Sequence, residues 1–393
     1  MRGAERDPVA PLPLARLGQW LAPRLGPGVS DVRVGEPGPP GAGQSSDTLV
    51  FDAQWVQDEK RCHGGFVMKR QPPTDRIFLD ADVLDEYRTL RALAGTGVPV
   101  PAVIGAEEDP AVLGARLFVM ARVPGTVPTG KPSIHTAGWL PTLTAAERRI
   151  VWSSALDALV AVHRTDWRGA LAFLPGADEA LGAGKSGPGA AGQALLTAHV
   201  GRLGRWYRWA TAGRSFPVTD AAWEYLRAGL PDVRGSEPVL LWGDARPGNM
   251  IFGADLSAAA VIDWEVAAIG PAEIDVAHWL VFDEFATSSG VPRLPGFPGR
   301  EAILDHYGRV AGRTPQCLDY FEVLQAFFLA TTLIRQADLG VRAGCFPAGT
   351  DMGRGNAITQ SLARRLGLPV PELSADYLRH RTPHGSASTG AAL

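Results

Sequence analysis

The spacing of hydrophobic and polar positions changes along the chain and separates a strand-rich first part from a mainly helical remainder. Short apolar runs predict strands at 48–56, 66–69 and 116–123, and again at 239–242 and 260–262. Apolar residues three or four positions apart predict helices at 14–25, 82–94, 145–163, 195–212 and 321–339, with a further helix after Asp275. The Gly- and Ala-rich residues 175–193 predict a flexible connector, and the polar tail from Arg381 predicts disorder.

Three polar residues follow the two late apolar runs. Asp244 comes directly after 239–242, Asn249 lies five positions later, and Asp263 ends the run 260–262. Each residue taken alone is typical of a turn. Together they supply a carboxylate that can accept a hydroxyl proton, and an amide and a second carboxylate that can hold a hard cation. The spacing is that of the catalytic loop and the metal-binding Asp of protein kinases.

These segments carry a family resemblance. The runs Trp242–Asn249, Ile262–Glu265 and Gly270–Asp275 resemble the aminoglycoside phosphotransferase family, closest to its actinobacterial and acyl-CoA-dehydrogenase-associated branch. The resemblance implies an α+β, two-lobed protein-kinase-like fold, with a small β-rich N-terminal lobe and a larger helical C-terminal lobe. It also implies ATP-dependent phosphorylation of a hydroxyl on a small molecule. The family usually has His at the position of Trp242, and because that His is mainly architectural, we expect activity to survive.

The first part of the chain supplies the candidate ATP-binding residues. The loop containing Gly43, Ser45 and Ser46 can offer backbone N–H groups and hydroxyls to phosphates, although such clusters are usually plain loops. Lys69 ends a strand, and Glu86 lies in the following helix, which is the order of the lysine–glutamate pair that orients an amine onto the α- and β-phosphates. Asp85 is the alternative partner, and the motif register favours Glu86.

Two further assignments depend on the same resemblance. In the family, the segment from Met120 to Arg122 is the hinge, where backbone groups hold the adenine edge; the alternative is an edge strand with a turn. Asp275 resembles a structural Asp of the family, which we interpret as a cap that braces the metal loop.

The predicted mechanism assigns one role to each residue. Asp244 orients the acceptor hydroxyl and takes its proton, Asn249 and Asp263 hold Mg²⁺, and Lys69, positioned by Glu86, neutralises phosphate charge. The alternative from another class is a catalytically inactive, kinase-like nucleotide-binding protein. A phosphate-ester hydrolase would need a second metal site or a water-positioning pair, and the sequence offers no additional His/Asp cluster for one.

The same interpretation sets the domain boundaries. We expect a leader with a short helix at 1–28, a nucleotide-binding lobe at 29–122, a catalytic and substrate lobe at 123–370, and a largely disordered tail at 371–393. The helix 195–212 carries Arg202, Arg205 and Arg208 beside aromatic residues. These arginines could recognise an anionic substrate, but we favour a solvated charged face with the aromatic residues in the core. We expect a structural role for His163.

Composition narrows the choice of partners. The net charge of −3 and the pI near 6.3 give no reason to expect a nucleic-acid or membrane partner. Three widely spaced cysteines indicate neither a disulfide framework nor a zinc site, and no apolar run suits a signal peptide or a membrane span, so we expect a cytoplasmic protein. The oligomeric state stays open.

The predicted partner is a small molecule with a hydroxyl group. A polycationic aminoglycoside would need an acidic pocket, whereas residues 275–338 mix acidic residues with arginines. The fused acyl-CoA dehydrogenase relatives suggest a hydroxyacyl-type acceptor instead.

Overall fold

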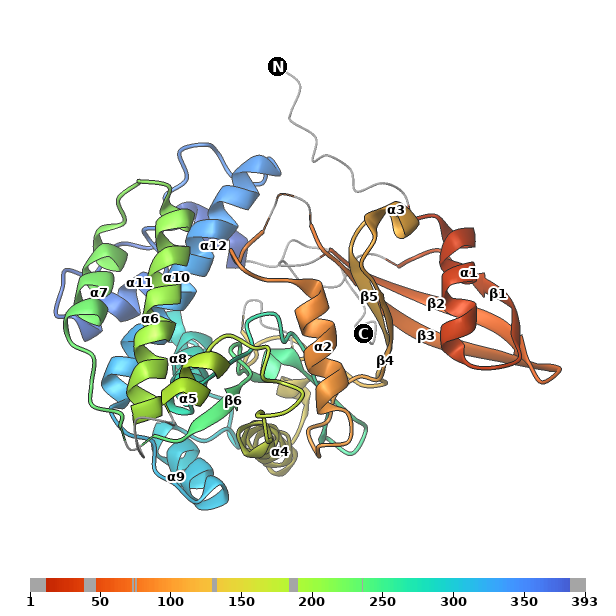
Figure 1. Cartoon of the computed structure of the whole chain (residues 1–393). Helices are drawn as coiled ribbons and strands as arrows, with labels where there is room; N and C mark the ends of the chain where they lie inside the picture. The colour runs from red at the N-terminus through yellow and green to blue at the C-terminus, as the bar shows by residue number, and fades with distance from the viewer. Residues whose placement is uncertain are drawn as a thin grey trace.

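The computed structural model describes residues 12–38, 47–72, 74, 76–128, 133–183, 190–234 and 236–381. Figure 1 shows a β-rich lobe formed by the first part of the chain, on the right, and a helical lobe on the left. The change of apolar spacing along the sequence therefore corresponds to a change of lobe. Gly43, Ser45 and Ser46 lie outside the described residues.

The N-terminal lobe is built on a five-stranded antiparallel sheet. Its order is β1 (Val29–Val34), β2 (Asp47–Gln57), β3 (Lys60–Arg70), β5 (Leu117–Ala121) and β4 (Val103–Glu107). Gln57 pairs with Lys60, so Asp58 and Glu59 alone form the hairpin turn, both with positive φ as a two-residue turn requires. The gap between the predicted strands 48–56 and 66–69 indicates a longer turn around 58–64, and that indication is wrong, because Gly64 and Gly65 belong to β3.

Successive side chains of β3 point to opposite faces of this sheet. Phe66 and Met68 pack against α1 (Leu14–Leu25), where Leu17, Trp20 and Leu21 are buried. Val67 faces the other core, which contains α2 (Val83–Leu93). Lys69 has the parity of Val67, so the pleat alone directs it toward α2.

A loop of the first lobe contacts the second. Between β3 and α2, the Phe78 ring stacks on Phe328 at 5.7 Å and lies 5.4 Å from the Trp206 ring. Trp206 Nε1 donates to the Ile77 carbonyl at 2.9 Å, and Arg335 donates to the Arg76 carbonyl at 2.8 Å. Aromatic packing and two backbone acceptors thus attach residues 76–78 to the helical lobe.

The second lobe contains two small sheets among helices. The strand pairs are β6 (Pro238–Leu241) with β9 (Ala268–Pro271), and β7 (Met250–Phe252) with β8 (Ala258–Val261). The remaining helices are α3 (Pro110–Leu113), at the edge of the first lobe, and α4 (Ala145–Arg164), α5 (Ala177–Ala183), α6 (Ala190–Thr211), α7 (Pro217–Ala228), α8 (Glu273–Ala286), α9 (Arg300–Ala311), α10 (Leu318–Arg342), α11 (Ala357–Arg365) and α12 (Ala375–Arg381).

Three predictions of irregular structure are wrong. The expected connector 175–193 contains α5 and the start of α6, with Ala177 and Ala180 buried. Residues 371–381 are not disordered, because α12 buries Tyr377. The Gly270-Pro271 pair, which by residue type predicts a turn, lies in β9. In each case small or turn-forming residues occupy positions where packing against neighbouring elements decides the structure.

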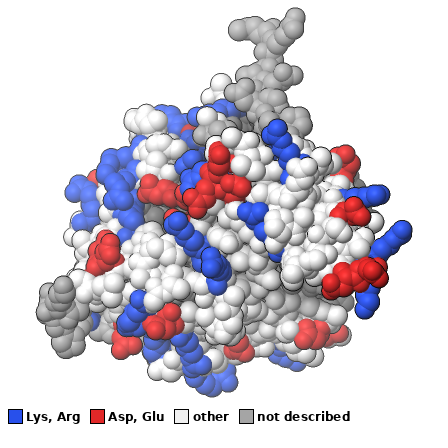
Figure 2. All heavy atoms as spheres, turned by 45° about the vertical axis from the view of Figure 1, so that its right-hand side comes forward, with Lys and Arg blue, Asp and Glu red and all other residues white. Residues whose placement is uncertain are grey.

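The surface drawn in Figure 2 carries basic side chains interspersed with acidic ones. Its central group of acidic residues has basic neighbours, so this face presents no continuous patch of one sign. No helix in the described ranges combines the length and the apolarity needed to cross a bilayer.

Packing of α1 on the sheet can be tested by truncating its core side chain. Leu17 is 0% exposed, so Leu17→Ala should lower the free energy of unfolding by about 2–5 kcal/mol through lost burial and a cavity. Gln19→Ala, on the exposed face of the same helix, should change it by less than about 0.5 kcal/mol. Urea denaturation would measure both, and equal effects would show that α1 contributes no core.

Candidate active site

The loop after β6 is shaped by a glycine and by a buried carboxylate. Gly243 has φ +89°, and a Cβ placed on it would lie 2.4 Å from the Val266 carbonyl oxygen, so only glycine fits. Asp275 of α8 accepts hydrogen bonds from the backbone N–H groups of Trp242 at 2.7 Å and Gly243 at 2.9 Å. The Asp275 carboxylate of α8 therefore fixes the backbone of the turn that precedes Asp244.

This arrangement corrects the role expected for Asp275. The N-cap of α8 is Ala272, and Asp275 lies in the first helical turn. Its carboxylate braces the loop of Asp244, not the loop of Asp263. His163 Nε2 lies 3.1 Å from the same carboxylate and its Nδ1 lies 2.7 Å from the Tyr307 hydroxyl, so both ring nitrogens of His163 have buried partners, as a structural histidine requires.

Asp244 has polar neighbours at both carboxylate oxygens. Arg246 Nε at 3.0 Å and His278 Nε2 at 2.9 Å contact Oδ1, while Asn249 Nδ2 donates to Oδ2 at 2.6 Å. Burial would raise the pKa of Asp244, but the Arg246 charge and the His278 hydrogen bond hold this pKa well below its ordinary value. The carboxylate is therefore ionised throughout the physiological pH range.

Asn249 connects the loop of Asp244 to the loop of Asp263. It ends a short 3₁₀ turn, Pro247–Asn249, and its carbonyl accepts the Ile262 N–H at 3.0 Å. Asp263 follows with φ +61°, a left-handed conformation that is costly for a residue other than glycine and is typical of functional sites. The pairing of β7 with β8, which this backbone hydrogen bond extends, thus brings the two loops together.

Lys69 lies between two carboxylates from different lobes. Its Nζ is 2.7 Å and 3.0 Å from the two oxygens of Glu86, and 2.7 Å from Asp263 Oδ1. Burial would lower the pKa of Lys69, but Asp263 and Glu86 outweigh burial and raise it above its ordinary value, so the amine stays charged. Of the two candidates on α2, Glu86 faces Lys69, whereas Asp85 pairs with Arg88 near the surface.

Asn249 and Asp263 suit a hard divalent cation by their chemistry. The Asn249 amide nitrogen is turned to Asp244, which directs its amide oxygen away from Asp244. An amide oxygen and a carboxylate are the donors that Mg²⁺ takes from proteins alongside water and phosphate oxygens. The two residues therefore fit the predicted metal site, and Lys69 beside Asp263 supplies further positive charge.

The predicted hinge residues lie at the end of β5. Met120 is buried and pairs with Val67 and Val103 within the sheet. The Arg122 N–H donates to the Gly65 carbonyl at 2.9 Å, and its guanidinium donates to Asp52 at 2.7 Å. Because this N–H is used within the sheet, a hinge contact to adenine would need neighbouring backbone groups.

Sequence reasoning missed two neighbours of Asp244. Arg246 lies within the quoted motif, and its guanidinium carbon is 4.7 Å from the centre of the Phe282 ring. His278 lies one helical turn after Asp275, so the i, i+3 spacing was the available signal. By contrast, Arg205 and Arg208 of α6 are exposed while Trp206 and Tyr207 are buried, as expected for a charged outer face. Arg202 departs from that prediction, because its side chain is only 20% exposed and lies 4.0 Å from Glu179.

Known proteins resemble this chain in both sequence and fold. The model of the phosphotransferase enzyme family, APH, matches residues 46–319. The chain belongs to this family. The match covers both loops described above, and it is to a family of phosphotransferase enzymes.

Sequence relatives of this family member are longer than the chain itself. It is 24% identical to mouse acyl-CoA dehydrogenase family member 11 over 368 residues, which cover 89% of this chain and 43% of the relative. It is 28% identical to mouse family member 10 over 230 residues, which cover 58% of this chain and 19% of the relative. The chain thus spans less than half the length of these relatives.

Solved structures share the phosphotransferase fold. A Ralstonia eutropha protein, named provisionally as an aminoglycoside phosphotransferase, superposes with a TM-score of 0.63 at 21% identity and covers 91% of this chain and 99% of its own. A macrolide 2'-phosphotransferase of type I gives 0.50 at 17% identity and covers 90% and 95%. At these identities the likeness establishes the kinase-like, two-lobed fold.

Trp242 makes an architectural contact between the two loops. The side chain is 0% exposed, and its Nε1 donates to the Ile262 carbonyl at 2.9 Å. The Trp242 ring also lies 6.1 Å from the Trp264 ring. Trp242 therefore ties the backbone before Asp244 to the backbone before Asp263.

This contact predicts the effect of Trp242→Phe. The substitution leaves the Ile262 carbonyl without its donor, so it should cost about 1–3 kcal/mol of stability and reduce the increase in melting temperature caused by Mg·ATP. Trp167→Phe is the matched control, since it removes an indole hydrogen bond to the Pro238 carbonyl and should leave the Mg·ATP effect unchanged. Differential scanning fluorimetry distinguishes the two, and an unchanged nucleotide effect in Trp242→Phe would refute the proposed tie.

Proposed function

We propose that this phosphotransferase transfers the γ-phosphate of Mg·ATP to a hydroxyl of a small molecule, with Asp244 as the catalytic base. The contact of Lys69 with Asp263 at 2.7 Å carries the proposal. It joins residues 194 positions apart, one from each lobe, and brings the phosphate-neutralising amine to the carboxylate assigned to the metal. An amine at this place is the part that phosphoryl transfer requires beside a metal.

Each residue acts on a different atom of the reaction. The ionised Asp244 accepts the hydrogen bond of the acceptor hydroxyl, aligns its oxygen with the phosphorus and takes its proton. Lys69, held by Glu86, neutralises α- and β-phosphate oxygens. Asn249 and Asp263 would hold Mg²⁺, which supplies charge stabilisation at the phosphates when bound. The low pKa of Asp244 makes orientation its larger contribution and proton removal a late event.

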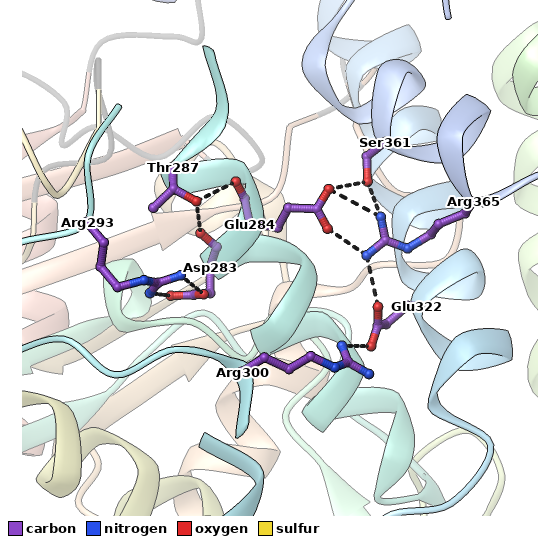
Figure 3. Close-up of polar contacts among 8 residues, drawn as sticks. All are labelled: Asp283, Glu284, Thr287, Arg293, Arg300, Glu322, Ser361 and Arg365. Carbon is purple, nitrogen blue, oxygen red and sulfur yellow. Dashed lines mark hydrogen bonds and ion pairs between the residues drawn. The ribbon is translucent and has the colours of Figure 1, made fainter. Parts of the chain in front are cut away.

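The charges of the helical lobe support an acceptor that is not a polycation. Figure 3 shows Asp283 against Arg293, Glu322 against Arg300, and Arg365 between Glu284 and Glu322. The Arg365 Nη2 distances are 2.6 Å to Glu284 and 2.9 Å to Glu322. Because each of these carboxylates has a guanidinium partner, the group offers little net negative charge to an aminoglycoside. We therefore favour a neutral or anionic hydroxyl compound, including a hydroxyacyl type.

The assigned base is tested by Asp244→Asn. The amide cannot take the acceptor proton, so transfer should fall by about 10³-fold or more, as expected for loss of a base and its orientation together. Mg·ATP should still raise the melting temperature. Asp255→Asn, at an exposed turn, is the matched control and should keep wild-type turnover. If Asp244→Asn transferred phosphate at the wild-type rate, Asp244 would not be the catalytic base.

The metal assignment is tested by Asp263→Asn. The variant should lose most of the Mg²⁺-dependent part of the ATP-induced rise in melting temperature, because one ligand charge is gone. EDTA should reduce the wild-type effect to the same level, whereas Asp255→Asn should respond like the wild type. A variant with an unaltered Mg²⁺ response would place the cation elsewhere.

A screen of hydroxyl compounds with γ-labelled ATP distinguishes the proposed kinase from a catalytically inactive nucleotide-binding protein. Labelled product from any acceptor, absent in Asp244→Asn, supports the kinase. Mg²⁺-dependent stabilisation by ATP, without transfer to any compound or to water, supports the inactive nucleotide-binding protein.

A further inference from the structure

A buried histidine of α8 reaches the catalytic loop from the helical core. His278 is 0% exposed, and its Nε2 lies 2.9 Å from Asp244 Oδ1. Within the described residues, no hydrogen bond, ion pair or ring contact joins His278 to Asn249 or Asp263. We propose that His278 is a positioning residue for phosphoryl transfer, one that fixes the carboxylate of Asp244 in its reactive orientation. The inference rests on the proposed function.

The His278 ring is itself fixed from several sides. Its Nδ1 lies 3.0 Å from Gln325 Oε1 of α10, and Gln325 is 2% exposed. The ring stacks on Phe282 with centroids 5.7 Å apart and meets Phe328 edge-on at 5.9 Å. Rotation about its side-chain bonds would break both polar contacts inside the core, so the ring has one orientation.

The hydrogen bond to Asp244 is satisfied by either protonation state of the ring. A doubly protonated ring donates to Asp244 through Nε2 and to Gln325 Oε1 through Nδ1. With the Gln325 amide turned over, a neutral ring donates through Nε2 and accepts at Nδ1. In both cases the N–H that faces Asp244 is the same.

The position of His278 on α8 explains why it matters for orientation. Asp275, one turn earlier, holds the backbone of Trp242 and Gly243, while His278 holds the side chain of Asp244. One helix face therefore fixes both the loop and its carboxylate. With Oδ1 held by His278 and Oδ2 held by Asn249, the plane of the carboxylate is set from two different elements.

Arg246, the other partner of Oδ1, cannot replace this support. Its side chain is 25% exposed and comes from the same loop as Asp244, so it moves with that loop. His278 is the partner of Oδ1 that belongs to a buried helix. Misorientation of a reacting group by a fraction of an ångström is costly in rate because the attacking oxygen must align with the phosphorus.

The experiment compares three purified variants. His278→Phe keeps a ring of similar size and removes the donor, His278→Gln returns an N–H near the place of Nε2, and His135→Phe is the matched control. His135 is 3% exposed in the helical lobe, and its ring Nδ1 accepts a hydrogen bond from the Leu294 N–H. The probe is γ-labelled Mg·ATP. Transfer to water is measured first, as released inorganic phosphate, and transfer to the acceptor found in the screen is measured second.

A loss of kcat without a change of KM is the expected signature. In His278→Phe, kcat should fall about 10–100-fold with the KM for ATP within about twofold of wild type, because orientation at the reacting centre is lost and binding is retained. His278→Gln should recover to within about fivefold of wild type, and His135→Phe should stay within about twofold. A histidine that only fills the core would lower stability in His278→Phe and His135→Phe alike and would not split kcat from KM.

Each other outcome has a definite meaning. Wild-type kcat in His278→Phe, or no recovery in His278→Gln, overturns the inference and leaves the proposed function standing. If His278→Phe does not fold, Gln325→Leu takes its place, because it loosens the ring without touching Asp244; kcat should fall about 3–10-fold, and an unchanged kcat overturns the inference. Absence of wild-type transfer to any acceptor overturns the proposed function and this inference with it.

Discussion

The contact of Lys69 with Glu86 and Asp263 is the interaction on which the site depends. A buried ammonium is costly unless it is paired, and here its two partners come from α2 and from the loop after β8. The amine can stay charged in the core only if both lobes keep their present relation. The first-lobe loop at 76–78 strengthens that relation, because it packs Phe78 against α6 and α10. Lobe arrangement and charge burial therefore support each other.

A second constraint is the way α8 serves the loop of Asp244. The helix is buried along its first two turns, so its side chains are rigid supports. Asp275 satisfies two backbone N–H groups that the sharp turn at Gly243 would otherwise leave unpaired. His278 reaches the Asp244 carboxylate from the same face. A turn that is strained in isolation becomes a single defined conformation when a packed helix supplies its hydrogen-bond acceptors.

The contacts between the two loops explain how this chain can have Trp242 where the family usually has His. The loop of Asp244 and the loop of Asp263 must be tied together for an amide and a carboxylate to face one cation. In this chain, one tie is the Asn249 carbonyl with the Ile262 N–H, and another is the Trp242 indole with the Ile262 carbonyl. An indole N–H can make that bond, so a Trp at this position is compatible with the architecture. The tie depends on a donor at the right place and not on one residue type.

Local pattern alone predicted β2, β3, β5, the apolar runs before Asp244 and Asp263, and the helices α1, α2, α4, α6, α8 and α10, because side-chain alternation and helical period are properties of short segments. It did not predict β1, β4, α7, α9 or α11. It failed for 175–193 and 371–381, where small and polar residues are helical only because neighbours cover one face. For His278, the partner of Asp244 on α8, 34 positions away, the sequence offered only the i, i+3 spacing from Asp275. Tertiary packing decided that contact and the choice of Glu86 over Asp85, since both depend on which faces of distant elements meet.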